Sequence, residues 1–189
     1  MITIASIREI SPNYDLVYGI VRSLKNKPDY VTQVPELAPS SELYSWYLKT
    51  KDEGNWNEST FNSIYVPRFI NELTQESKSK LKEIGGLDKQ GKNILLFCFC
   101  PNEKLCHRSI IAGILQGMKC NVNISTDYSY YYDMFLKVHG KHKNIKLEIL
   151  ELDEEPDCGK CKHINDSYTI CNKCGPEYGW QYYYSQYFI

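Results

Sequence analysis

The sequence lacks an excess of charge of either sign. Its 189 residues contain 22 Lys and Arg against 23 Asp and Glu, which leaves a formal net charge of −1. Such a balance gives no long-range attraction to nucleic acids or acidic membranes, although acidic stretches elsewhere can offset a local basic patch. A nucleic-acid partner therefore gains no support from the charge.

Long apolar runs are also missing. No stretch approaches the roughly 18–20 apolar residues that a membrane-spanning helix needs. The opening MITIASIREI does not have the basic-then-apolar order of an export signal. We therefore expect a soluble, cytoplasmic protein with no membrane partner. In an unexported chain, the eight cysteines are expected to be metal ligands, reactive thiols or small buried side chains rather than disulfides.

What the sequence does contain is an alternation of strand-like and helix-like segments. The most apolar segment, ILLFCFC within residues 93–100, indicates a central strand buried on both faces. Further strands are expected at 2–7, 16–21, 121–124 and 145–150, and a long ordered loop at 23–39. Helices are expected at 40–54, 58–73, 75–84 and 126–138 and after the CHR motif, with Gly85 and Gly86 ending the third. This alternation predicts an α/β domain over residues 1–152, and the acidic run ELDEEPD marks its boundary with a small module over 153–189.

Four cysteines form two C-x2-C pairs near the C-terminus, Cys158 with Cys161 and Cys171 with Cys174. Two thiolates separated by two residues can bind the same ion, and two such pairs supply the four sulfurs of a closed tetrahedral site. The spacing predicts one structural zinc ion per chain in a zinc-ribbon-like module. Such a module stabilises the fold or recognises a partner without catalysing a reaction. Two disulfides or a redox dithiol are the alternatives.

A second group of cysteines accompanies the predicted central strand. Cys98 and Cys100 end this strand, and Cys106, His107 and Arg108 begin the next helix. Ligands of open α/β sheets bind beyond the carboxyl ends of the strands, and helix N-termini favour anions and thiolates. We expect Cys106 or Cys98 as a nucleophile and His107 as a general acid or base. Arg108 is expected to bind a phosphate or carboxylate.

Three interpretations of this group stay open. In the first, a cysteine is the nucleophile beside an anion-binding arginine, as in cysteine-dependent phosphatases, although seven residues separate Cys100 from Arg108 and the loop has no glycine. In the second, the three cysteines and His107 bind another metal ion, for which a C-x-C pair on a buried strand is an awkward geometry. In the third, Cys98 and Cys100 are small core residues, and His107 and Arg108 cap the helix.

Several segments together resemble a known family. They are VR at 21–22, PELAPS at 35–40, IYVPRF at 64–69 and LLFC…CHRSIIAG at 95–113. Over about residues 1–125 they resemble the bacterial and phage family called domain of unknown function 488, the YeaO-like proteins. The resemblance implies no settled activity. It implies a three-layer, Rossmann-like α/β fold in which one pocket gathers Arg22, Cys98, Cys106, His107 and Arg108.

The chain differs from the pattern of that family in two respects. Many members have a glutamate where this chain has Cys100, which removes any chemistry that depends on that carboxylate. The C-terminal zinc module is an addition to the family pattern, and it suggests a specialised partner.

These observations lead to a hypothesis about function. We expect an enzyme, a thiol- or histidine-dependent hydrolase or transferase, that acts on an anionic small molecule such as a nucleotide-like or phosphorylated ligand. Arg22 and Arg108 are expected to bind the anion, and Tyr65 or Tyr130 to stack on a base. The alternative is a non-enzymatic module in which the zinc-binding segment and a tyrosine-rich surface contact nucleic acid or a protein partner.

Overall fold

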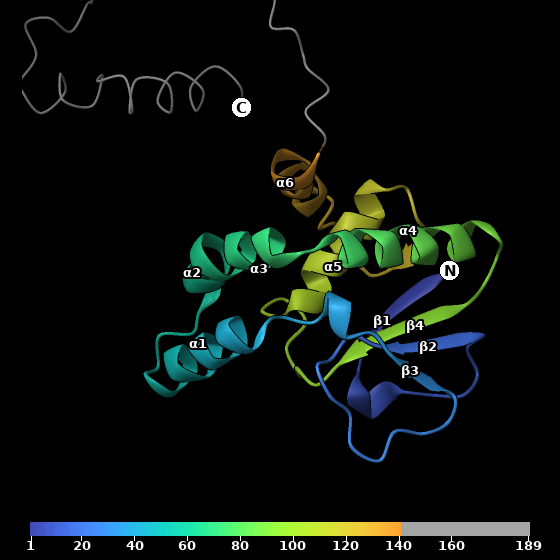
Figure 1. Cartoon of the computed structure of the whole chain (residues 1–189), viewed down its shortest axis with the longest axis horizontal. Helices are drawn as coiled ribbons and strands as arrows, with labels where there is room; N and C mark the ends of the chain where they lie inside the picture. The colour runs from blue at the N-terminus through green and yellow to red at the C-terminus, as the bar shows by residue number, and fades with distance from the viewer. Residues whose placement is uncertain (141–189) are drawn as a thin grey trace, which may run out of the picture. The chain divides into compact units, whose positions relative to one another are not determined.

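The computed structural model describes residues 1–140, which belong to one compact unit, Met1–Lys141 (Figure 1). The strand expected at 145–150, the domain boundary at 152 and the predicted zinc ligands Cys158, Cys161, Cys171 and Cys174 lie outside the described residues. These expectations stay predictions.

The described chain alternates strands and helices. The strands are β1 (Ile2–Ser6), β2 (Leu16–Gly19), β3 (Val31–Gln33), β4 (Ile94–Cys98) and β5 (Val122–Asn123). The α-helices are α1 (Ser41–Asp52), α2 (Glu58–Thr60), α3 (Val66–Glu72), α4 (Gln75–Lys89), α5 (His107–Gly117) and α6 (Tyr130–His139). Two short 3₁₀ helices, η1 (Ile7–Glu9) and η2 (Pro35–Leu37), and a π-helical segment, η3 (Phe61–Tyr65), complete the described elements.

The five strands form one parallel sheet in the order β3-β2-β4-β1-β5. β4 lies between β2 and β1, with Leu96 opposite both Tyr18 and Ile4. All five residues of β4 are buried, which explains why this segment is apolar without alternation. The predicted α/β architecture, a sheet flanked by helices with β4 at its centre, is therefore confirmed.

The two faces of the sheet are covered differently. One face packs against the helices, with Ile4 and Leu96 in the same core as Ile110 and Ile114 of α5. Figure 1 shows α4 and α5 on this side of the sheet. On the other face, Leu95, Phe97 and their neighbours pack against the β1–β2 connection, which contains η1. In the described part of the chain, the helical layer is thus thick on one face and thin on the other.

Two sequence predictions about elements are wrong. The region expected to be a loop at 23–39 contains β3, whose three residues are too few to show a hydrophobic period. α4 does not end at Gly85 and Gly86 but continues to Lys89. A Cβ atom on Gly85 would lie 3.2 Å from the Cys120 sulfur, so this glycine serves close packing. Gly91, with φ of +81°, has the left-handed conformation that is common just after a helix.

The segment 58–72 is one continuous run of helix made of α2, η3 and α3. Its middle is π-helical, a rare geometry that is found frequently at functional sites. The rings of Phe61, Tyr65 and Phe69 stack along it, with centroids 5.5 and 6.1 Å apart. This stack holds Tyr65 toward the carboxyl edge of the sheet, where the candidate site lies.

None of the helices between residues 1 and 140 has the length and apolar composition needed to cross a membrane.

Candidate functional site

The candidate site lies at the carboxyl ends of β2 and β4, where parallel sheets commonly bind ligands. β4 ends at Cys98, and Cys106 is the N-cap residue of α5. Ile20 follows β2 directly, and its N–H donates a hydrogen bond to the Phe97 carbonyl at 3.0 Å. The end of β2 is thereby held beside the end of β4.

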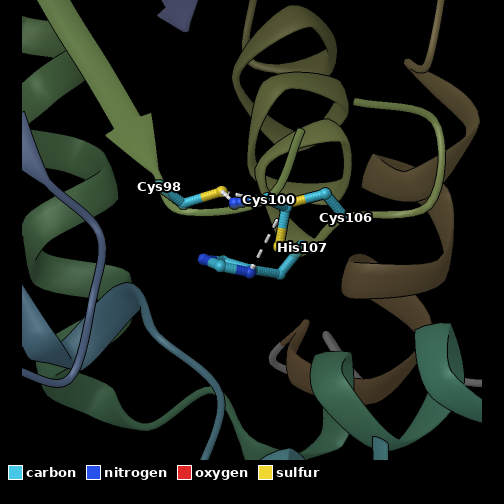
Figure 2. Close-up of side chains that lie close together, drawn as sticks. All are labelled: Cys98, Cys100, Cys106 and His107. Carbon is cyan, nitrogen blue, oxygen red and sulfur yellow. Dashed lines mark hydrogen bonds between the residues drawn. The ribbon is translucent and has the colours of Figure 1, made fainter. Parts of the chain in front are cut away.

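Three sulfurs and one imidazole meet at this point. The possible ligand atoms of Cys98, Cys100, Cys106 and His107, hereafter the Cys–His cluster, all lie within 4.8 Å of one another. The sulfurs of Cys98 and Cys106 are 3.0 Å apart. Figure 2 shows the four side chains converging from the end of β4 and the start of α5. Cys98, Cys106 and His107 are buried, whereas Cys100 is partly exposed on the loop that follows β4.

His107 is held in one orientation by the backbone of β2. Its Nε2 lies 2.9 Å from the Ile20 carbonyl oxygen, and its Nδ1 lies 3.7 Å from the Cys106 sulfur. A carbonyl oxygen only accepts, so Nε2 carries the hydrogen and Nδ1 directs a lone pair at the sulfurs. Burial lowers the pKa of His107, which favours this neutral form. The imidazole is therefore available as a base or as a metal ligand.

The three thiols of the cluster differ in acidity. Hydrogen bonds from the thiols of Cys106 and Cys98 lower the pKa of Cys100, and the nearby His107 and Arg108 act in the same direction. The hydrogen bond to Cys100 raises the pKa of Cys98, and burial raises that of Cys106. The first proton lost from the cluster therefore leaves a thiolate at Cys100, the most exposed of the three.

The cluster forms one end of a pocket of about 350 Å³. Four aromatic residues from the helical region, hereafter the aromatic wall, line another part of it: Tyr44, Tyr47, Trp56 and Tyr65. Two cations, Arg22 and Lys51, also line the pocket. Arg22 follows β2, and its Nη1 donates a hydrogen bond to the Pro39 carbonyl at 3.2 Å. Reactive sulfurs, flat apolar surfaces and positive charge thus border the same space.

Within the aromatic wall, the Trp56 ring packs edge to face against the rings of Tyr47 and Tyr65, and the Tyr44 ring is tilted against that of Tyr47. The Trp56 centroid lies 4.6 Å from that of Tyr47 and 5.3 Å from that of Tyr65. Tyr65 is buried, and this burial raises the pKa of its hydroxyl well above the ordinary value. The hydroxyl is therefore protonated at neutral pH and can donate a hydrogen bond to a ligand.

Most of the predicted site residues come together. Cys98, Cys106, His107, Arg22 and Tyr65 all line the one pocket. Their catalytic and binding roles remain predictions.

Arg108 and Tyr130 lie elsewhere than expected. Arg108 is buried, and its Nη1 donates to the Ala5 carbonyl at 2.6 Å, so its side chain connects α5 to β1 and does not line the pocket. Its positive charge still acts on the cluster by lowering the pKa of Cys100. Tyr130 is an exposed residue of α6 and is not among the pocket residues.

The sequence interpretation missed part of the pocket. Tyr44, Tyr47 and Lys51 face it from α1, and their spacing of three and four residues is that of one helix face. That spacing was a usable signal. Trp56 lies between α1 and α2, and no local pattern marks it as a pocket residue.

Comparison of the chain with curated proteins and with solved structures finds no match in either set. A family model described as the active DUF488-N3 subclade, DUF488-N3a, matches residues 16–119, which is more than half of the chain. The matched range contains the Cys–His cluster, Arg22 and the whole aromatic wall. The chain therefore belongs to the DUF488 family.

Proposed function

We propose that the protein is an enzyme that acts on a nucleotide-like or similar phosphorylated ligand in the pocket at the ends of β2 and β4. One observation carries this proposal. The same pocket is lined by the Cys–His cluster, by five aromatic side chains (the aromatic wall and Phe99) and by two cations. These three features supply, in turn, a reactive group, a stacking surface for a flat ring and a counter-charge for phosphate.

The dimensions and chemistry of the pocket favour a small ligand. A volume of about 350 Å³ lies near the lower end of the roughly 300–1,000 Å³ that small-molecule sites occupy. The exposed ring of Tyr44 and the partly exposed rings of Tyr47 and Trp56 offer apolar surface to a base. Arg22 and Lys51 are exposed and can move to follow a phosphate group.

The reaction that fits the cluster is a nucleophilic substitution in two steps. The Cys100 sulfur attacks an electrophilic atom of the ligand, and the bond to the leaving group breaks as that group takes a proton from the Cys106 thiol. Water or another acceptor then attacks the intermediate, returns a proton to Cys106 and releases the Cys100 thiolate. The lowered pKa of Cys100 supports its assignment as the nucleophile in place of the more deeply buried Cys98 or Cys106.

Ligand binding is the first test. Titration of the full chain with a nucleoside monophosphate, the matching nucleoside and inorganic phosphate, followed by calorimetry, should rank the nucleotide as tightest. The Trp56→Leu variant should bind weakly, whereas Trp46→Phe, a change outside the pocket lining, should bind normally. Absence of binding by all three compounds to folded wild-type protein contradicts the proposed ligand class.

Turnover is the second test. A panel of nucleotides and sugar phosphates, each with water and with simple acceptors, should include a compound that the wild type converts. Cys100→Ser should abolish the conversion. Cys120→Ser, a change at a cysteine outside the cluster, should leave it unchanged. Full activity of Cys100→Ser would exclude the thiol mechanism.

A further inference from the structure

We propose that Cys98, Cys100, Cys106 and His107 together bind one zinc-class metal ion. The proposed site uses none of the four cysteines of the C-terminal segment and consists wholly of described residues. The inference does not rest on the proposed reaction. In the metal-loaded protein Cys100 and Cys106 are both metal-bound thiolates, so the reaction proposed above belongs to the metal-free form.

The spacing of the four donor atoms fits a single ion. Tetrahedral zinc has Zn–S bonds of about 2.3 Å and Zn–N bonds of about 2.0 Å, which places ligand atoms roughly 3.3–3.8 Å apart. The Cys98 and Cys106 sulfurs are 3.0 Å apart, and the Cys106 sulfur is 3.7 Å from Nδ1 of His107. All four donor atoms lie within 4.8 Å of one another. These separations need to change by up to about 1 Å, shared between the two atoms of each pair, to complete a tetrahedron.

The hydrogen bond of His107 to the backbone supports the same conclusion. A metal-bound imidazole almost always donates its second N–H to a carbonyl, carboxylate or water, which fixes the tautomer and the ring direction. Here the Ile20 carbonyl lies 2.9 Å from Nε2, and the free lone pair on Nδ1 faces the sulfurs. A histidine that only capped the helix would not require this arrangement.

The surroundings of the sulfurs suit metal-bound thiolates. The backbone N–H groups of Cys100 and Arg108 approach the sulfurs of Cys98 and Cys106 at 3.3 and 3.5 Å. Three thiolates and one divalent ion leave a single negative charge. The buried guanidinium of Arg108 offsets this charge, and its Nε has no hydrogen-bond partner among the described residues.

The expected obstacle, a C-x-C pair on a buried strand, does not exist in the structure. β4 ends at Cys98, so Cys100 lies on the following loop and its N–H turns back toward the Cys98 sulfur. The two other ligands lie at the start of α5, and the central strand and a buried helix hold them in place. All four proposed ligands line the pocket, and Cys100 is the most exposed of them.

The first experiment removes the other candidate site and leaves the cluster unchanged. The full chain carrying Cys158→Ser, Cys161→Ser, Cys171→Ser and Cys174→Ser is titrated with cobalt(II) and then with zinc. We expect one equivalent of cobalt to bind with sulfur-to-cobalt charge-transfer absorption and to be displaced by zinc. Adding Cys100→Ser and Cys106→Ser should abolish this signal, and adding Cys120→Ser should not. Absence of binding in the folded four-serine variant overturns the proposal.

A second experiment uses wild-type protein, so it does not depend on how any variant folds. Zinc-loaded protein is alkylated with and without a chelator, and each cysteine is followed by mass spectrometry. Cys100 should be protected until the chelator is added, whereas Cys120 should react equally in both samples. Equal modification of Cys100 in both samples overturns the metal site. Nucleotide binding is measured separately, so a metal-loaded protein that binds no nucleotide supports this site while contradicting the proposed function.

Discussion

The two ends of the pocket differ in how they are built. At one end, the Cys–His cluster is set by the central strand, by a helix buried along most of its length and by backbone groups of β2. At the other end, α1 carries two residues of the aromatic wall and Lys51, yet buries only Leu43 and Thr50. Elements with few buried contacts open at lower free energy than elements of the core.

This difference suggests a division of labour between the two ends. The buried end is preorganised, as chemistry or metal binding requires, because its atoms have little freedom to move. The α1 end is adjustable and suited to the capture of a ligand. Substitutions at the buried end should therefore affect reaction and stability, and those at the α1 end should affect affinity.

The largest effect is expected at Cys100. If the buried end holds the reactive thiolate, Cys100→Ser should lower kcat by about 10³-fold or more with little change in KM, since a hydroxyl is a far weaker nucleophile. Steady-state kinetics on the substrate found in the turnover test will measure this. A rise in KM with kcat unchanged would assign Cys100 a role in ligand binding. The two ends of the pocket would then not differ in function.

The pH dependence of alkylation should separate Cys100 from Cys120 in metal-free protein. The pKa of Cys100 is lowered by hydrogen bonds from neighbouring thiols, and that of Cys120 is raised by burial. Cys100 is then ionised at neutral pH, so its rate with iodoacetamide should be flat between about pH 7 and 9. The Cys120 rate should rise about tenfold per pH unit below its pKa. Parallel profiles for both cysteines, read by mass spectrometry, would contradict the assigned acidities.

Stability should respond to the buried end of the pocket more than to the α1 end. His107→Ala leaves the Ile20 carbonyl without its donor and empties buried space, so the free energy of unfolding should fall by about 1–3 kcal/mol. Tyr44→Ala, at an exposed ring of α1, should change it by less than about 0.5 kcal/mol. Urea unfolding of both metal-free variants will compare them. Equal losses in the free energy of unfolding would show that residues at the α1 end contribute as much to stability as residues at the buried end.

The smallest effect is expected at Arg22. This side chain is exposed, so its attraction to phosphate is screened and worth about 0.2–1 kcal/mol. Arg22→Gln should therefore weaken nucleotide binding by roughly 1.4- to fivefold at low salt, and the difference should shrink as salt rises. Calorimetry at two salt concentrations will test this. A loss that does not depend on salt would indicate a buried contact of Arg22 in the bound state.

Much of the architecture could be predicted because it depends on local patterns. The unbroken apolar run of β4 indicated a strand buried on both faces, and the isoleucine stripe of α5 indicated a core-facing helix. The errors arose where such patterns are absent or misleading. β3 is too short to show a period, and Gly85 serves packing against Cys120 instead of ending α4.

The sequence by itself determined the α/β class, the family and the position of a cysteine-rich junction between strand and helix. Only the tertiary structure decided what the side chains at that junction do. The His107 ring is directed by the Ile20 carbonyl, 87 residues away in the chain, and Arg108 is drawn to the Ala5 carbonyl, 103 residues away. Local periodicity sets which element forms, but the direction of a polar side chain at its end depends on which distant backbone group satisfies it.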